Sequence, residues 1–187
     1  MKKYWVILLL LSSIVAAAQG NKGKTEACAP MKKGKVCYTD EVDVPGKSKQ
    51  DIFNAIDIWA KKNYGRDVFM SNVNANKSKY TVLVSSKIEL LLNDSTKTFL
   101  SYKMFITCDE NKYSSEMRNL VYQYDAEGDK RFRTYKAEEV IADNGLSNTA
   151  ATVKDPVLFC NATFFFAENL FGELSSAVTE QLDNDSN

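Results

Sequence analysis

The sequence predicts an α+β domain: a single curved antiparallel sheet with two main helices on one face. In several segments between residues 36 and 124, outside residues 48–64, apolar and polar residues alternate over the length of a strand. Residues 48–64 and 156–182 instead carry apolar residues at helical spacing. The links between the middle strands are four or five residues long. Because a parallel crossover needs about a dozen residues, these links require antiparallel hairpins.

Composition narrows the classes of function. The chain has 187 residues, with 24 basic and 24 acidic side chains and no histidine. This length is typical of one domain. The lack of histidine removes the commonest general base and every Ser-His or Cys-His nucleophile pair. The balanced charge lacks the electrostatic signature of a nucleic-acid binder, so we expect no nucleic-acid partner.

Residues 1–18 have the three-part layout of a secretory signal peptide. A basic start, Met1-Lys2-Lys3, precedes an apolar run, and small residues end at Ala18, where we expect cleavage. Residues 4–18 make an apolar run of 15, below the roughly 18 to 20 that span a bilayer. We therefore predict a periplasmic or secreted protein with no membrane span in the mature chain.

The first half of the mature chain predicts a leader, a strand and a helix. Residues 19–34 are rich in lysine and glycine without apolar periodicity, which predicts a flexible leader. The single domain is expected over residues 35–182, beginning with a strand that Pro45-Gly46 ends. Ser48 is the expected N-cap of the first helix, and Trp59 continues its apolar stripe, so we expect Trp59 to be buried.

The second half predicts four hairpin-connected strands, an edge strand, a short helix and a long terminal helix. Pro156 suits the first turn of that last helix, and residues 183–187 are expected to form a disordered tail. The expected strands are residues 68–73, 80–92, 98–108, 113–124 and 131–135, and the short helix is residues 137–142.

The order of these elements, together with two segments of the chain, resembles a known family. The first segment is Val42-Asp43-Val44-Pro45-Gly46-Lys47-Ser48, running into a helix that ends at Ile58-Trp59-Ala60. The second is Tyr135–Asp143. The chain is similar to secreted bacterial domains of unknown function whose fold is like that of the TATA-binding protein (TBP). The resemblance covers nearly the whole mature chain. It implies a fold and an exported location but no reaction, so no catalytic residue and no cofactor is carried over.

The four cysteines leave their pairing open. Cys28, Cys37, Cys108 and Cys160 are an even number, and export would permit disulfides. Four cysteines allow three complete pairings, which the sequence does not separate. Burial as free thiols in the core is the alternative. No C-x-x-C spacing occurs, so neither a zinc site nor a thioredoxin-type site is expected.

The terminal helix is the expected partner surface of an exported, non-enzymatic binding domain. Its apolar residues exceed what one sheet covers. Phe165 and Phe166 are expected to face the sheet with Leu158, Ala162 and Leu170. A second stripe is left for an envelope protein or a second copy of the chain. That stripe consists of Cys160, Phe164, Ala167 and Phe171.

Other functions are less well supported by the sequence. An envelope hydrolase would use carboxylates or a Ser-Lys pair, but the acidic pairs Asp109-Glu110 and Glu138-Glu139 fit a hairpin turn and a helix start. DNA binding by analogy of fold is opposed by export, by a mature charge near −2 and by the lack of a basic cluster on the strands.

One modification is also expected. Asp94-Ser95-Thr96 resembles the pattern that some Gram-negative anaerobes O-glycosylate on exported proteins, and Ser95 falls in a predicted hairpin loop.

Overall fold

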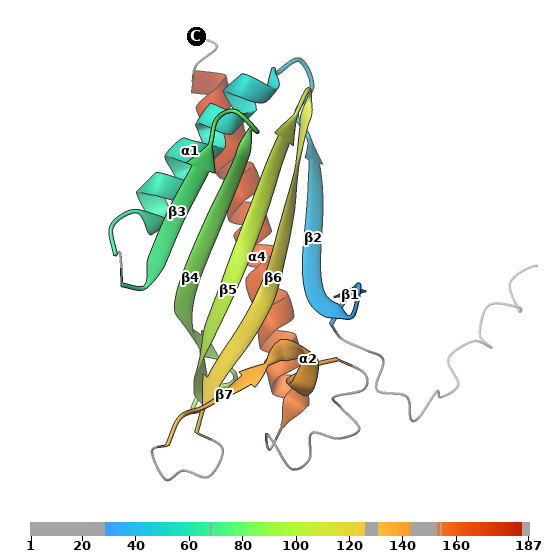
Figure 1. Ribbon diagram of the computed structural model, residues 1–187, viewed down its shortest axis with the longest axis vertical. Helices are drawn as coiled ribbons and strands as arrows, with labels where there is room; N and C mark the ends of the chain where they lie inside the picture. Colours follow the sequence, from blue (N-terminus) through green and yellow to red (C-terminus); the bar gives the residue numbers. More distant parts are fainter. Residues whose placement is uncertain (1–28, 68, 126–130, 143–152, 154, 185–187) are drawn as a thin grey trace, which may run out of the picture.

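The computed structural model describes residues 29–67, 69–125, 131–142, 153 and 155–184 (Figure 1). The signal peptide, its cleavage site at Ala18 and the leader up to residue 28 lie outside these residues. The elements are β1 (Met31–Lys32), β2 (Lys35–Asp43), α1 (Lys49–Tyr64), β3 (Ser71–Asn76), β4 (Thr81–Leu91), β5 (Lys97–Asp109), β6 (Lys112–Tyr124), β7 (Arg133–Lys136), α2 (Ala137–Val140) and α4 (Pro156–Asn184).

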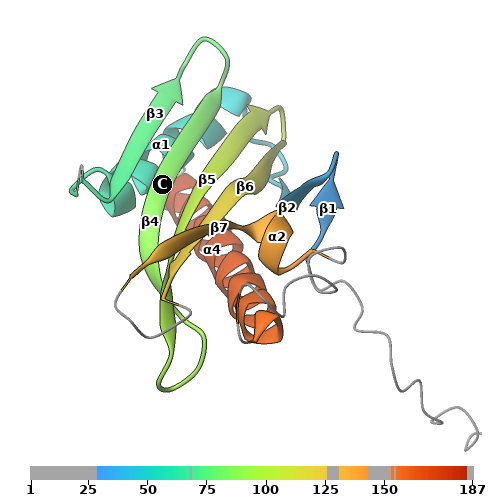
Figure 2. The same ribbon diagram turned by 60° about the horizontal axis from the view of Figure 1, so that its bottom comes forward.

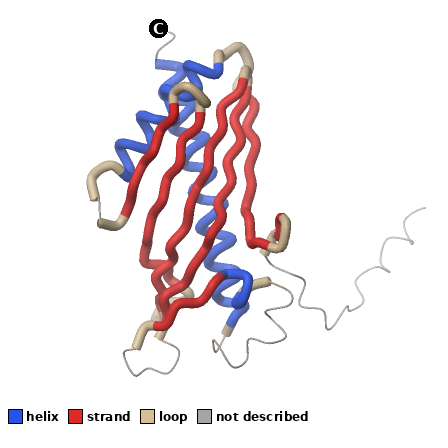
Figure 3. Tube along the Cα trace, in the orientation of Figure 1, coloured by secondary structure: helices blue, strands red, loops and turns tan. Residues whose placement is uncertain are grey.

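One antiparallel sheet of seven strands forms the domain. Its order is β1-β2-β6-β5-β4-β3, with β7 paired to the end of β6. Figures 1 and 2 show α1 and α4 behind the same face of this sheet, and the trace in Figure 3 shows the opposite face of β3 to β6 open. The predicted α+β class and the single sheet with two main helices on one face are therefore confirmed.

A bulge in β6 keeps its apolar residues on the helix-covered face. Ser101 of β5 pairs with Val121, whereas Lys103, two positions later, pairs with Arg118, three positions earlier. The strand β6 therefore has one extra residue, and Asn119 there has a φ of 57°. The extra residue resets the alternation, so that Met117 and Leu120, three positions apart, are both buried.

The helix α4 runs along the covered face and closes the core. Its 29 residues extend about 44 Å, close to the length of a 13-residue strand such as β5. The Thr163 hydroxyl donates to the Phe159 carbonyl at 2.7 Å and accepts from the buried Tyr122 hydroxyl, also at 2.7 Å. The Phe159 ring meets those of Tyr122 and Tyr124 edge-on, with centroids 5.0 and 5.1 Å apart.

The helix α1 begins and ends where the sequence predicts. The Ser48 hydroxyl accepts a hydrogen bond from the Asp51 amide at 3.2 Å, which makes Ser48 the N-cap. The Gly65 amide donates to the Lys61 carbonyl at 3.0 Å at the other end. The buried residues of α1 are Ile52, Phe53, Ala55, Ile56, Trp59 and Ala60.

Both ends of the domain differ from expectation. Met31–Lys32, in the segment predicted as a flexible leader, forms β1 and pairs with β2. The hairpin forms because Lys33 and Gly34 both have positive φ, 52° and 73°, as a type I′ turn requires. The helix α4 continues through Asp183 and Asn184, so the predicted tail does not begin at residue 183. Residues 185–187 lie outside the described residues.

The cysteines divide into two kinds. Cys37 and Cys108 are buried free thiols, and burial raises the pKa of Cys108 to about 12. Cys160 is buried and disulfide-bonded, while Cys28 lies outside the described residues.

No described helix combines the length and the apolar character that crossing a membrane requires.

The first prediction concerns Trp59, which is 6% exposed and meets Tyr64 edge-on at 5.5 Å between ring centroids. We expect Trp59→Ala to lower the free energy of unfolding by about 3–5 kcal/mol, because it removes a buried aromatic ring. Urea denaturation measures this. The neighbouring Ile58 is 49% exposed, so Ile58→Ala is the matched control and should cost less than about 1 kcal/mol. Equal costs would contradict the orientation of α1.

Candidate functional site

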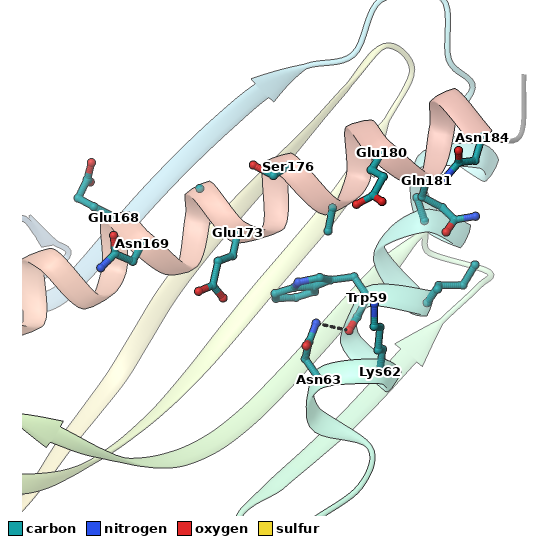
Figure 4. A pocket seen from close by; sticks show the side chains of 14 residues that line it. Trp59, Lys62, Asn63, Glu168, Asn169, Glu173, Ser176, Glu180, Gln181 and Asn184 are labelled. Carbon is teal, nitrogen blue, oxygen red and sulfur yellow. Dashed lines mark hydrogen bonds between the residues drawn. The ribbon is translucent and has the colours of Figure 1, made fainter.

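A groove of about 710 Å³ lies between α1 and α4. Figure 4 shows Trp59, Lys62 and Asn63 on one side and the polar face of α4 on the other. The Asn63 amide donates to the Trp59 carbonyl at 2.9 Å, which fixes that side chain on the last turn of α1. The α4 residues that line the groove are Glu168, Asn169, Gly172, Glu173, Ser176, Ala177, Glu180, Gln181 and Asn184.

The α4 side of the groove is acidic. Glu168, Glu173 and Glu180 line it, and Lys62 is the one cation among the described residues of the lining. Within the part of the chain that the structure describes, no salt bridge or hydrogen bond is formed by these three carboxylates. Burial raises the pKa of the neighbouring Tyr64, and the charge of Glu173 adds to that rise because it opposes a phenolate. The groove therefore presents unpaired negative charge beside an aromatic residue.

Gly172 breaks the pattern of α4 without a packing reason. Glycine inside a helix costs about 0.5–1 kcal/mol relative to alanine. A Cβ placed on Gly172 would have no atom within 4 Å, so no neighbour requires glycine there. Its effect is to leave the middle of the groove open. A local rule broken without a structural gain is typical of a functional position.

The predicted partner surface is wrong for three of its four residues. Cys160, Ala167 and Phe171 are buried in the core. The stripe faces the sheet because two other residues on the same side of α4 contact Tyr122 of the sheet. Thr163 forms a hydrogen bond with the Tyr122 hydroxyl, and the Phe159 ring packs on the Tyr122 ring.

Phe164, the fourth residue of the predicted partner surface, is 41% exposed. Phe165, expected to face the sheet, is 64% exposed and meets Phe164 edge-on, with ring centroids 5.7 Å apart. Phe166 does contact the sheet, edge-on to Tyr102.

The carboxylates considered for hydrolysis have structural partners. Glu110 accepts from the Lys49 amide at 3.3 Å, Glu138 from the Val36 amide at 3.1 Å and Glu139 from the Lys136 amide at 3.2 Å. Among the described residues, no group of three His, Cys, Asp or Glu side chains could hold a metal ion.

Ser95 lies in the exposed loop between β4 and β5, where its hydroxyl and amide both donate to the Asn93 side chain. Its O-glycosylation stays a prediction.

Sequence reasoning missed the groove because its α4 residues look like an ordinary solvent-exposed helix face. The signal that could have found it is Gly172, the one glycine inside a helical pattern. It also missed a set of basic residues that the sheet brings together on its open face from separate strands.

Comparison with known proteins identifies the family. Residues 38–123 match the model of a domain of unknown function (DUF4468) with TBP-like fold. The crystal structure of a TBP-like protein from Parabacteroides distasonis is 62% identical, covers 81% of this chain and 97% of its own, and has a TM-score of 0.77. The chain belongs to the DUF4468 family. The expected resemblance is thereby confirmed.

A second structure shows how far the fold extends beyond close sequence similarity. A DUF4468 family protein from Bacteroides ovatus is 22% identical over 82% of this chain and 91% of its own, with a TM-score of 0.70. No curated protein matches the chain. The family comparison therefore gives the fold, and the function has to be argued from the surface of the molecule.

The second prediction compares Gly172 inside α4 with Gly65, the residue that caps the end of α1. We expect Gly172→Ala to raise the free energy of unfolding by about 0.5–1 kcal/mol, because the space is open and alanine favours the helix. Gly65→Ala is the control and should be destabilising, since its Cβ would lie 2.5 Å from the Lys61 carbonyl oxygen. Chemical denaturation of both variants measures this. A loss of stability in Gly172→Ala would show that the groove is filled by neighbouring atoms.

Proposed function

We propose that this protein is an exported, non-enzymatic binding domain that holds a positively charged peptide segment of an envelope protein in the α1–α4 groove. The observation that carries the proposal is a set of three unpaired carboxylates among the groove residues of α4. Glu173 and Glu180 point toward α1, and Glu168 lies at the margin of the groove (Figure 4). A lysine- or arginine-bearing segment supplies the complementary charge, which speeds encounter and selects against acidic partners.

The shape of the groove supports a peptide rather than a compact ligand. Three carboxylates spread over 13 residues of α4 extend along about 18 Å of helix axis. The open space at Gly172 gives room for a chain to cross between the helices. The exposed Ile58 and the edge of Trp59 offer apolar contacts on the α1 side of the groove.

The exported location rests on the signal-peptide pattern of residues 1–18. An envelope protein of a Gram-negative bacterium is then the class of partner that the domain would meet, and self-association is the alternative. Mass spectrometry of the exported protein tests this, because cleavage after Ala18 would give the mass of a chain that begins at Gln19.

The hydrolase alternative lacks a paired nucleophile. Ser176 and Lys62 both line the groove, but no hydrogen bond between them is found in the described part of the chain. Nucleophilic catalysis requires the base within hydrogen-bonding distance of the hydroxyl.

The third prediction tests the groove by intrinsic fluorescence. Trp59 is the only tryptophan once residues 1–18 are removed, so its emission reports on the groove directly. A peptide that alternates lysine and leucine should change this emission on binding, and its glutamate counterpart should not. Replacing Glu168, Glu173 and Glu180 by glutamine should weaken binding about tenfold, since three exposed ion pairs at about 0.5 kcal/mol each contribute about 1.5 kcal/mol.

Glu89→Gln is the matched control, because Glu89 is an exposed carboxylate of β4 that pairs with Lys97 away from the groove. This variant should bind the lysine peptide like the unchanged protein. Equal binding of the acidic peptide, or no effect of the triple replacement, would contradict the proposed function. Hydrolysis of the bound peptide would favour the enzyme instead.

A further inference from the structure

A polar row crosses the open face of the sheet at the bulge of β6. The pairing register places Asn72, Ser85, Lys103, Arg118 and Cys37 side by side on β3, β4, β5, β6 and β2. Successive residues of a strand point to opposite faces, and the neighbours Val84, Tyr102 and Met117 are buried against the helices. This row therefore faces away from α1 and α4, and it is independent of the groove proposed above.

Two cations stand directly opposite each other in this row. Lys103 of β5 pairs in register with Arg118 of β6, and like charges in such a pair are destabilising. The Arg118 guanidinium lies 3.8 Å from the centroid of the Phe105 ring and 3.7 Å from Glu116. Its Nε atom is buried and has no hydrogen-bond partner among the described residues. Lys103 is exposed and forms neither a salt bridge nor a side-chain hydrogen bond in the described part of the chain.

Further cations surround this pair. Two hollows, of about 320 and 440 Å³, adjoin on either side of Asn119, the bulge residue that lines both. Six cationic side chains line the two hollows: Lys32, Lys33, Lys35, Lys87, Lys103 and Arg118. Among the residues that the structure describes, Glu116 is the one carboxylate that lines either hollow, and its salt bridge with Lys32 neutralises one of the six charges. The expected lack of a basic cluster on the strands is therefore wrong, because strand pairing assembles one.

Most of the other residues that line the first hollow carry hydroxyl or amide groups. Ser71, Ser85 and Ser101 line the first hollow together with Asn72 and Asn119. At the edge of this hollow, the Phe69 ring is 95% exposed. An exposed aromatic ring beside hydroxyl and amide groups can stack on the apolar face of a sugar ring while the polar groups bond its hydroxyls.

We propose that the open sheet face around Asn119 binds an acidic oligosaccharide, a sugar chain that bears carboxylate or sulfate groups. The anionic groups lie against Lys103 and Arg118, which relieves the repulsion between these two side chains. The hydroxyls of the sugar bond the serine and asparagine side chains, and one ring stacks on Phe69.

The experiment uses a sulfated heparin oligosaccharide as the probe and a neutral dextran oligosaccharide as its uncharged counterpart, both measured by titration calorimetry. We expect the sulfated chain to bind and the neutral chain not to bind. Lys103→Ser should weaken binding at least about fivefold while the melting temperature stays equal or rises, because a like-charge pair is removed. Phe69→Ala should also weaken binding without lowering the melting temperature.

Lys97→Ser is the matched control. Lys97 lies on the same face of the same strand, outside both hollows, and pairs with Glu89. This variant should change binding by no more than about twofold. Unchanged binding in Lys103→Ser, or an equal loss in Lys97→Ser, overturns the site. A single-stranded DNA oligonucleotide that binds more tightly than the sulfated chain at the same ionic strength overturns the oligosaccharide as the ligand.

Discussion

The extra residue of β6 at Asn119 is the constraint on which the rest of this structure depends. Without it, alternation along the strand would turn Leu120 and Tyr122 to the open face after Met117. With it, both residues are buried and the Tyr122 hydroxyl reaches Thr163 of α4. That bond, and the packing of Phe159 on the same tyrosine, sets which side of α4 meets the sheet. The backbone conformation at Asn119, with its positive φ, therefore determines how the terminal helix is turned.

Two surfaces of opposite charge follow from this arrangement. Because α1 and α4 lie on one face, their polar sides meet in a groove whose α4 wall carries unpaired glutamates. On the other face of the sheet, no helix of the described residues covers the middle strands, and the bulge lies between two hollows lined by lysines and Arg118 (Figure 3). A net charge near zero conceals this separation, since the basic and acidic side chains cancel in the sum. Two separate binding surfaces on one small domain are the functional consequence that we propose.

The fold could be predicted because its signals are local. Strand alternation, short hairpin links and the Ser48 cap each involve residues close together in the chain, and all are present in the structure. The orientation of α4 could not be predicted in the same way. Three consecutive phenylalanines allow several apolar stripes. Contacts with residues far away in the sequence select one of them, such as the contact between Thr163 and Tyr122, 41 positions apart. The basic row was missed for a related reason, because Lys103 and Arg118 become neighbours through strand pairing alone.

The stability of variants at residue 119 tests the role of the bulge most directly. Glycine adopts a positive φ without steric cost, so Asn119→Gly should change the free energy of unfolding by less than about 1 kcal/mol. Valine is strongly disfavoured there, and Asn119→Val should cost about 1–3 kcal/mol more than the glycine variant. Asn74→Val, at an exposed β3 position without a positive φ, is the control and should be close to neutral. Urea denaturation that finds Asn119→Val as stable as Asn119→Gly would contradict the account.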